Sequence, residues 1–388
     1  MAEWGPARIG AVTTVVGLAT LVLNGPAGAL VDRSRSPRLL VAAGCAAILV
    51  GTLLLLPARG FWTVLAAQFI AAAGGVLVVP ALAGLTLGIV GKAAFPRQQG
   101  RNQAFNHVGI LSAALLVGFG TRAFGVGVAF WVLAAMAVGA LVAVRALPAE
   151  AWNRRRALGW KEDDADSDDH YGSIRAVLAN RGLLLMAAAL GFFNLGNGSM
   201  LALMGQRMVA EGRDAITWTA VYVVVAQLTM VPVALWAGAL ADRQGRRRLL
   251  LLACAVLPVR ALLTAFVSDP YWLVLAEILD GVASAVIGVA VPVIVADLTW
   301  GSGRTQTALG TVNAIQGIGG ALSSLVGGLL ANWLGWTGAL LALAVPAVLA
   351  FVLALRLEET AEDVRERREE RRRARKAGRR GSPAARDA

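Results

Sequence analysis

The sequence contains few charged residues and only two cysteines and two histidines. Charged side chains account for 15% of its 388 residues and hydrophobic ones for 57%, whereas soluble domains contain about 25% charged residues. This balance excludes a water-soluble globular chain. Cys45 and Cys254 occupy equivalent places in the two halves of the chain, and we expect packing residues there, with neither a disulfide nor a metal pair.

Sequence motifs that carry enzymatic chemistry are also missing. The chain has no Gly-x-x-x-x-Gly-Lys-Ser/Thr loop for ATP, no His-Glu-x-x-His and no Gly-x-Ser-x-Gly. Its polar segments are too short to form a nucleotide-binding domain. We therefore expect no enzyme, no cofactor and no metal site, and any transport would draw on an ion or solute gradient.

Long apolar runs make up most of the chain. Each is long enough for a helix to cross a hydrocarbon core of about 30 Å. The sequence therefore predicts an all-α polytopic transmembrane bundle. Eleven runs cover roughly residues 8–31, 37–57, 62–90, 104–121, 124–145, 182–206, 216–241, 248–267, 271–296, 305–332 and 335–356.

The formal net charge of +12 is carried mainly by arginines in short loops between the runs and in the C-terminal tail. No basic face with interleaved aromatic residues occurs, which argues against nucleic acid as a partner. By the positive-inside rule the arginine-rich loops are cytoplasmic, so we expect an integral protein of the plasma (inner) membrane. The tail is either a solvated topogenic segment or an element that binds anionic lipid headgroups.

One polar loop occurs twice, half a chain apart. The stronger copy spans residues 238–248 and a weaker copy spans residues 28–38, with aspartates 210 positions apart. The pattern Gly-x-Leu-x-Asp-Arg-x-Gly-Arg-Arg closely resembles the signature loop of the major facilitator superfamily of secondary transporters. The residues that carry the resemblance are Gly28, Asp32, Arg33 and Arg38 in the first copy, and Gly238, Asp242, Arg243, Gly245, Arg246 and Arg247 in the second.

The resemblance implies two homologous halves in a pseudo-symmetric bundle. We expect an N-terminal half over residues 1–147, a cytoplasmic linker over 148–181, a C-terminal half over 182–356 and a basic cytoplasmic tail over 357–388. Family members have six helices in each half, but here only one apolar run precedes Asp32. The family's first helix is therefore missing, through a misassigned start or a truncation; the alternative is a genuine eleven-helix protein.

The resemblance also assigns a role to the two aspartates. In the family such an aspartate docks on a helix N-terminus of the opposite half, where N–H groups and the helix dipole favour an anion. By repeat symmetry we expect Asp32 to face residues 303–306 and Asp242 to face residues 100–103. The latch partners expected in these segments are Arg101 and Arg304. Alternatively, both aspartates are merely charged turn residues.

The first copy of the loop departs from the family pattern at two positions. Arg35 stands where the family has glycine, and Pro37 stands where it has a basic residue. We therefore expect the contact made by Asp32 to be weaker than the contact made by Asp242.

Three ionisable residues fall inside apolar runs, where charge is costly. Arg260 lies about 16 Å from one membrane face and Asp280 about 14 Å from the other, at a rise of about 1.5 Å per residue. In a core of about 30 Å these depths coincide, so we expect the two to pair. Glu277 shares the face of Asp280. The cluster is either a structural ion pair or a site that couples protons or substrate.

Carboxamide side chains also occur within the runs. Those on facing helices would line a central cavity for a polar ligand, or they would bridge neighbouring helices. The cavity candidates are Asn194, Asn197, Gln227, Asn313 and Gln316, with Gln68 as a further candidate. His107 lies close to the start of its run, which favours a position near the membrane interface.

The combined interpretation is a secondary active transporter that moves a small organic solute by alternating access. Export is the expected direction by family analogy, and protons are the candidate coupling ion. We expect a monomer in contact with membrane lipid. The alternative is a truncated or non-transporting membrane receptor or scaffold with the same fold.

Overall fold

The computed structural model describes residues 6–361 apart from 59, 126, 148 and 161–173, together with 364 and 366. These residues are almost entirely helical, and the part described contains no strand. Much of the expected linker and nearly all of the expected tail lie outside it. The helices are α1 (Pro6–Arg33), α2 (Pro37–Leu55), α3 (Phe61–Phe124), α4 (Val128–Ala146), α5 (Arg154–Leu158), α6 (Ile174–Ala179), α7 (Arg181–Asn197), α8 (Met200–Ala210), α9 (Ala215–Gln244), α10 (Arg246–Phe266), α11 (Pro270–Leu298) and α12 (Thr305–Leu355).

Within the described residues, nine helical segments are long and apolar enough to cross a membrane, with α7 and α8 counted as one. Two of them, α3 and α12, contain 64 and 51 residues, although about 20 suffice for one crossing. Each consists of two helices joined at a glycine with non-helical angles: Gly91 (φ 72°, ψ 173°) and Gly335 (φ 70°, ψ 178°). These two breaks account for the eleven apolar runs of the sequence.

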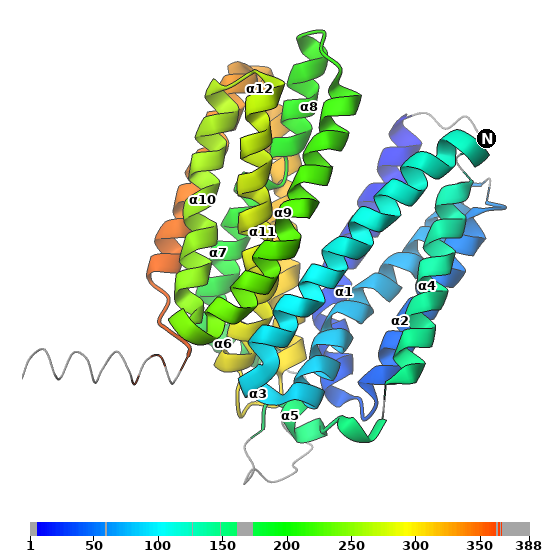
Figure 1. Ribbon diagram of the computed structural model, residues 1–388, viewed down its shortest axis with the longest axis vertical. Helices are drawn as coiled ribbons and strands as arrows, with labels where there is room; N and C mark the ends of the chain where they lie inside the picture. Colours follow the sequence, from blue (N-terminus) through cyan, green and yellow to red (C-terminus); the bar gives the residue numbers. More distant parts are fainter. Residues whose placement is uncertain are drawn as a thin grey trace, which may run out of the picture.

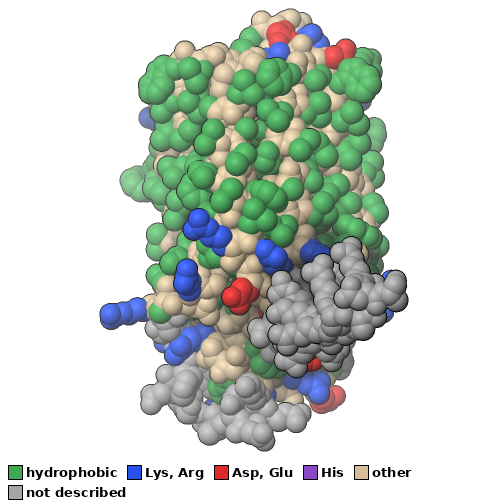
Figure 2. Space-filling view, turned by 90° about the vertical axis from the view of Figure 1, so that its left-hand side faces the viewer, with side chains coloured by type: hydrophobic (Ala, Val, Ile, Leu, Met, Phe, Trp, Pro, Cys, Tyr) green, Lys and Arg blue, Asp and Glu red, His purple; other side chains and the backbone are tan. Residues whose placement is uncertain are grey.

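The surface of the bundle is suited to a bilayer. On the face drawn in Figure 2, hydrophobic side chains form a broad band, and most Lys and Arg side chains gather toward one end. Large apolar side chains such as Phe119, Trp131 and Leu325 are more than half exposed. Such side chains are suited to contact with lipid tails, and helices pair most of their main-chain groups internally, as a membrane span requires. The protein is an integral membrane protein.

The helices form two groups that lie side by side (Figure 1). The N-terminal group contains α1–α4, in which α3 packs on α1, α2 and α4. The C-terminal group contains α7–α12, in which α12 packs mainly on α7 and α10. Contacts between the groups are chiefly those of α1 with α12 and of α3 with α9 and α11. We call the end of the bundle that carries residues 28–38 and 238–248 the signature-loop end.

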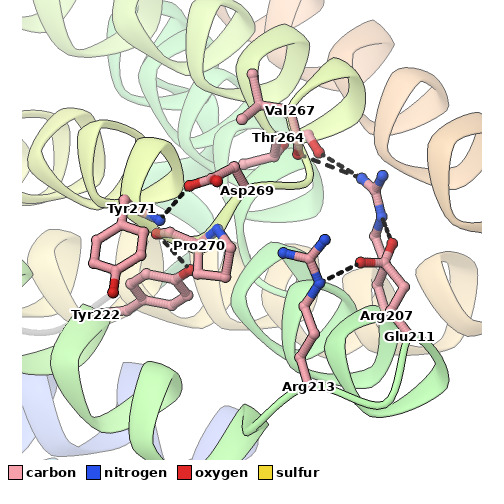
Figure 3. A network of polar contacts seen from close by, with 9 residues as sticks. All are labelled: Arg207, Glu211, Arg213, Tyr222, Thr264, Val267, Asp269, Pro270 and Tyr271. Carbon is pink, nitrogen blue, oxygen red and sulfur yellow. Dashed lines mark hydrogen bonds and ion pairs between the residues drawn. The ribbon is translucent and has the colours of Figure 1, made fainter.

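At the opposite end, a polar network ties the C-terminal group together (Figure 3). The Glu211 carboxylate on the α8–α9 loop pairs with Arg207 at 2.8 Å and with Arg213 at 3.1 Å. Arg207 also donates to the carbonyl of Thr264 on α10, and the Tyr222 hydroxyl donates to the carbonyl of Pro270 on α11 at 3.0 Å. These contacts join the ends of α8, α9, α10 and α11.

The break in α12 yields a stability prediction. A backbone with φ near 70° and ψ near 180° is accessible almost only to glycine, and other residues lose about 1–3 kcal/mol there. We expect Gly335→Ala to destabilise the protein by about this amount in thermal unfolding in detergent. Gly328→Ala is the matched control, because Gly328 is helical and its added methyl meets no atom within 4 Å. Equal melting temperatures for the two variants would contradict the prediction.

Candidate functional site

The Asp32 side chain joins the two groups at the signature-loop end. Asp32 lies in the last turn of α1 and is 1% exposed. Its Oδ1 accepts the main-chain N–H of Gln306 at 3.0 Å. Its Oδ2 accepts the main-chain N–H of Thr307 at 2.7 Å and the Thr307 hydroxyl at 2.6 Å. Because α12 begins at Thr305, both N–H groups belong to the first turn, where they lack intrahelical partners and the dipole favours an anion.

This arrangement refines the expectation from the sequence. Repeat symmetry placed the partner of Asp32 within residues 303–306, and the structure places the donors at Gln306, the last of these residues, and at Thr307, the next one. The donors are main-chain N–H groups and a hydroxyl, whereas the sequence had indicated Arg304, which instead precedes the first residue of α12. Asp32 makes three hydrogen bonds despite the departures at Arg35 and Pro37. Pro37 is the first residue of α2, a position that proline favours. That the Asp32 contact is weaker than the Asp242 contact stays a prediction.

Glycines bring the two groups into main-chain contact near this latch. A Cβ atom at Gly28 would overlap the carbonyl oxygen of Gln306 and lie 2.9 Å from the Cα of Thr307. On the other side of the bundle, a Cβ at Gly100 of α3 would lie 2.9 Å from the Cα of Gly238 of α9. The signature-loop end is therefore closed along two glycine seams, α1–α12 and α3–α9.

The remaining residues of the first loop and the partner expected in α3 lie around these seams. Arg38 donates to the main-chain carbonyl of Arg145 at the end of α4. Arg33 and Arg101 are exposed. Asp242 is half-buried and lies one turn beyond Gly238 on α9. Its expected contact with residues 100–103 stays a prediction.

The second signature loop is bound to its own group by two acidic residues that sequence reasoning missed. After the turn at Gly245 (φ 95°), the main-chain N–H groups of Arg246 and Arg247 donate to one oxygen of Glu359 at 2.8 and 3.4 Å. The Arg246 guanidinium pairs with Asp297 at 3.2 Å. Glu359 follows α12 and is 7% exposed, although the sequence assigned it to a solvated tail. The signal available in the sequence was the acidic pair Glu358 and Glu359, which directly follows the last apolar run.

Arg260, Glu277 and Asp280 form a buried ion cluster. Arg260 Nη2 lies 2.9 Å from Glu277 Oε1, and Nη1 lies 3.1 Å from Asp280 Oδ1. Arg260 is 2% exposed and Glu277 1%. The structure therefore places Arg260 beside Asp280, as the depth argument from the sequence predicted. One guanidinium faces two carboxylates, so the cluster carries a net charge of −1 when all three are ionised, and one proton neutralises it.

Asn197 completes this cluster because the helix that carries it is broken. α7 ends at Asn197 and α8 begins at Met200, within one membrane crossing. At the break, the Ser199 N–H donates to the Ser323 hydroxyl at 2.9 Å. Asn197 accepts from Arg260 Nη1 and donates to Asp280 Oδ1 at 2.9 Å. Broken helices at membrane depth are tolerated where they line a site, so this break marks the cluster as a functional candidate.

A polar cavity of about 330 Å³ lies between the two groups of helices. Two of the predicted cavity amides, Asn313 and Gln316, line it. The amides that sequence reasoning had not assigned to the cavity come from the part of α3 that follows the break at Gly91. The carboxamides of the lining are Gln99, Asn102, Gln103, Asn106, Asn313 and Gln316.

The other predicted cavity amides lie elsewhere. Gln227 Oε1 is 2.9 Å from Nδ1 of His107, which bridges α9 and α3 and is buried. Asn194 donates to the Leu190 carbonyl of its own helix at 3.1 Å. Gln68 is exposed on the first turns of α3. Of these three amides, only Gln227 bridges two helices, as the alternative interpretation of membrane amides holds. Asn194 bonds within its own helix and Gln68 faces outward.

A larger cavity of about 1070 Å³ separates the groups at the end opposite the signature loops. It lies between α3 and the α8–α9 hairpin, and side chains such as Phe119, Leu201 and Val223 make its wall mostly apolar. Arg122 is its one charged lining residue. The two groups thus touch at the signature-loop end and stand apart at the other.

Comparison with known proteins agrees with this architecture. The family model described as Major Facilitator Superfamily matches residues 1–259 and 212–385. The chain belongs to this superfamily. Two proteins of Mycobacterium tuberculosis (strains H37Rv and CDC 1551), each named as an uncharacterized MFS-type transporter, are 38% identical over 91% of this chain and 85% of their own length. The puromycin resistance protein of Streptomyces alboniger is 34% identical over 30% of this chain and 23% of its own length.

Solved structures share the fold of this transporter. The human organic anion transporter MFSD10 aligns with a TM-score of 0.68 over 88% of this chain and 82% of its own, at 17% identity. The FucP transporter in the outward conformation aligns with a TM-score of 0.71 over 92% of this chain and 91% of its own, at 15% identity.

The ion cluster yields the second prediction. Removing one partner of a buried ion pair costs about 3–5 kcal/mol, because the remaining charge is left without compensation. We expect Arg260→Met to lower unfolding stability by this order and the triple variant Arg260→Met/Glu277→Gln/Asp280→Asn to recover most of the loss. Arg213→Met is the control, since its pair with Glu211 is about a third exposed and contributes about 0–1 kcal/mol. A single Arg260→Met variant as stable as this control would refute the assignment.

Proposed function

We propose that this protein is a secondary active transporter that exports a small organic solute across the plasma membrane by alternating access. The observation that carries the proposal is the asymmetry of the two ends. Asp32 and the glycine seams close the signature-loop end, and a cavity of about 1070 Å³ opens the other. With the signature-loop end in the cytoplasm, as the arginine distribution favours, this is an outward-facing state.

The energetics of the Asp32 contact suit a reversible latch. Hydrogen bonds to a charged group contribute about 1.5–3 kcal/mol each, and desolvating a carboxylate costs several kcal/mol. Three such bonds therefore roughly balance the burial of Asp32. When the groups rock apart, water replaces the helix N-terminus as the donor, so opening the latch carries no large penalty.

Export as the direction is supported by the partial likeness to the puromycin resistance protein and by family analogy. That likeness covers 30% of the chain. We use it in support of export as the direction of transport, and we do not assign puromycin as the solute. The linker (148–181) and the tail (357–388) are proposed to be cytoplasmic, because described residues of each, Trp152 and Glu359, lie against α3 and the second signature loop at the signature-loop end. No catalytic role is proposed.

Proton coupling is assigned to the ion cluster. Asp280 is the more accessible of its two carboxylates, with a side chain 16% exposed against 1% for Glu277. A proton on Asp280 weakens its attraction to Arg260 and its bond from Asn197. Asn197 is the last residue of α7 before the helix break. Protonation of Asp280 therefore changes the contacts that hold α7 against α10 and α11. The cluster thereby links proton binding to the position of a broken helix.

Flux measurements test this proposal. In proteoliposomes with a trapped pH-sensitive dye, the wild type should move protons when an exported solute from a metabolite panel is added. Asp280→Asn should lose proton movement and proton-driven accumulation, yet still exchange labelled solute, because an amide preserves the hydrogen bonds but cannot titrate. Asp269→Asn, a helix cap at the opposite end, is the control and should behave like the wild type.

Two results would count against the proposal. If the wild type behaves like empty liposomes with every solute, transport itself is refuted. If Asp280→Asn moves protons at the wild-type rate, the ion cluster is structural and the coupling site lies elsewhere.

A further inference from the structure

The lining of the cavity of about 330 Å³ combines carboxamides with apolar residues and carries no charge. Its walls come from both helices of α3, from α11 and from the first turns of α12. Apart from its six carboxamides, the lining consists of apolar residues, glycine and proline, and no lining residue is ionisable. The volume is at the lower end of the range of about 300–1000 Å³ for small-molecule sites.

Carboxamides select ligands by hydrogen bonding. Each offers two N–H donors and a carbonyl acceptor, so a wall of amides satisfies hydroxyl and amide groups of a ligand in either direction. An ionised ligand would lose part of its hydration in this cavity without meeting an opposite charge, which is costly. The cavity therefore discriminates against ions and favours neutral polar molecules.

A main-chain carbonyl adds a further acceptor to this wall. Pro292 of α11 has no N–H, so the carbonyl of Gly288, four residues earlier, lacks its intrahelical partner. The structure satisfies it from the other group of helices. Gln103 Nε2 donates to this carbonyl at 2.9 Å, and Gln99 Nε2 lies 3.4 Å from it. Gly288, Pro292 and both glutamines line the cavity.

We propose that this cavity binds a neutral small molecule bearing several hydroxyl or amide groups, and that the Gly288 carbonyl accepts a hydrogen bond from it. This assignment rests on the proposed transport function and names the chemical class of its solute. A ligand O–H or N–H that reaches Gly288 replaces the donor supplied by Gln103. Ligand binding thereby releases a hydrogen bond that holds α3 to α11 across the two groups, which favours their separation.

Binding measurements on the purified protein in detergent test the assignment. The probes are two matched sets: glucose, gluconate and glucosamine, and adenosine with adenosine monophosphate. At least one neutral member, glucose or adenosine, should raise the melting temperature in a saturable way, and the charged members should not. Loss of one hydrogen bond should weaken the apparent affinity about fivefold, so Asn313→Leu and Gln316→Leu should each show this change.

Pro292→Ala is the sharpest variant, because it restores an N–H to position 292 that occupies the Gly288 carbonyl within the helix. It removes a helix interruption, so it should fold at least as well as the wild type while binding the neutral probe about fivefold more weakly. The matched controls are Pro346→Ala in α12 and Asn194→Leu in α7, both outside the cavity lining. These controls should retain wild-type affinity.

Three outcomes would overturn the assignment: stabilisation by charged probes only, stabilisation by no probe, or cavity variants that bind like the controls. Because binding is measured without flux, the two proposals fail separately. A protein that is stabilised by a neutral probe but moves no solute in liposomes refutes transport and keeps the site. A protein that moves solute but is stabilised only by charged probes refutes the class of solute and keeps transport.

Discussion

The structure depends on one set of hydrogen bonds, which joins a buried carboxylate to the start of a helix. Asp32 lacks water, and the first N–H groups of α12 lack intrahelical partners, so each supplies what the other needs. The two lie in different groups of helices, so the contact forms only when the signature-loop end is closed. Gly28 permits it, because any side chain there would strike the main chain at Gln306. When this end opens, the Asp32 carboxylate and the first N–H groups of α12 must form hydrogen bonds with water instead.

Around this reversible contact, each group is held together by contacts that need not break. In the C-terminal group, Glu359 and Asp297 bind the second signature loop. At the opposite end Arg207 ties α8 to α10, and Glu211 pairs with both Arg207 and Arg213 of the α8–α9 loop. Contacts between the groups include the glycine seams and hydrogen bonds of single carboxamide side chains, such as the one between Gln227 and His107. Rigid groups joined by a few exchangeable contacts are what a rocking mechanism requires.

The sequence predicted the parts of this account that depend on hydropathy, charge or repetition. The eleven apolar runs and the Arg260–Asp280 pair follow from the cost of charge and unpaired main chain in lipid. The Asp32 contact follows from the family resemblance and from the repeat of the signature loop. The sequence did not predict the partners of amides. A carboxamide can form hydrogen bonds with any polar neighbour, so the local backbone decides its partner. At the break in α7, Asn197 joins the ion cluster, whereas Asn194 bonds to its own helix. The burial of Glu359 escaped prediction because it depends on where the segment after α12 folds back.

Distances measured by pulsed electron paramagnetic resonance test the central claim, that Asp32 holds one end closed while the other is open. After Cys45 and Cys254 are replaced by serine, spin labels at Phe124 and Val209 span the apolar cavity, and labels at Glu150 and Arg248 span the signature-loop end. The account predicts that Asp32→Ala shortens the first distance and lengthens the second relative to the unaltered pair. Unchanged distances at both ends would contradict it.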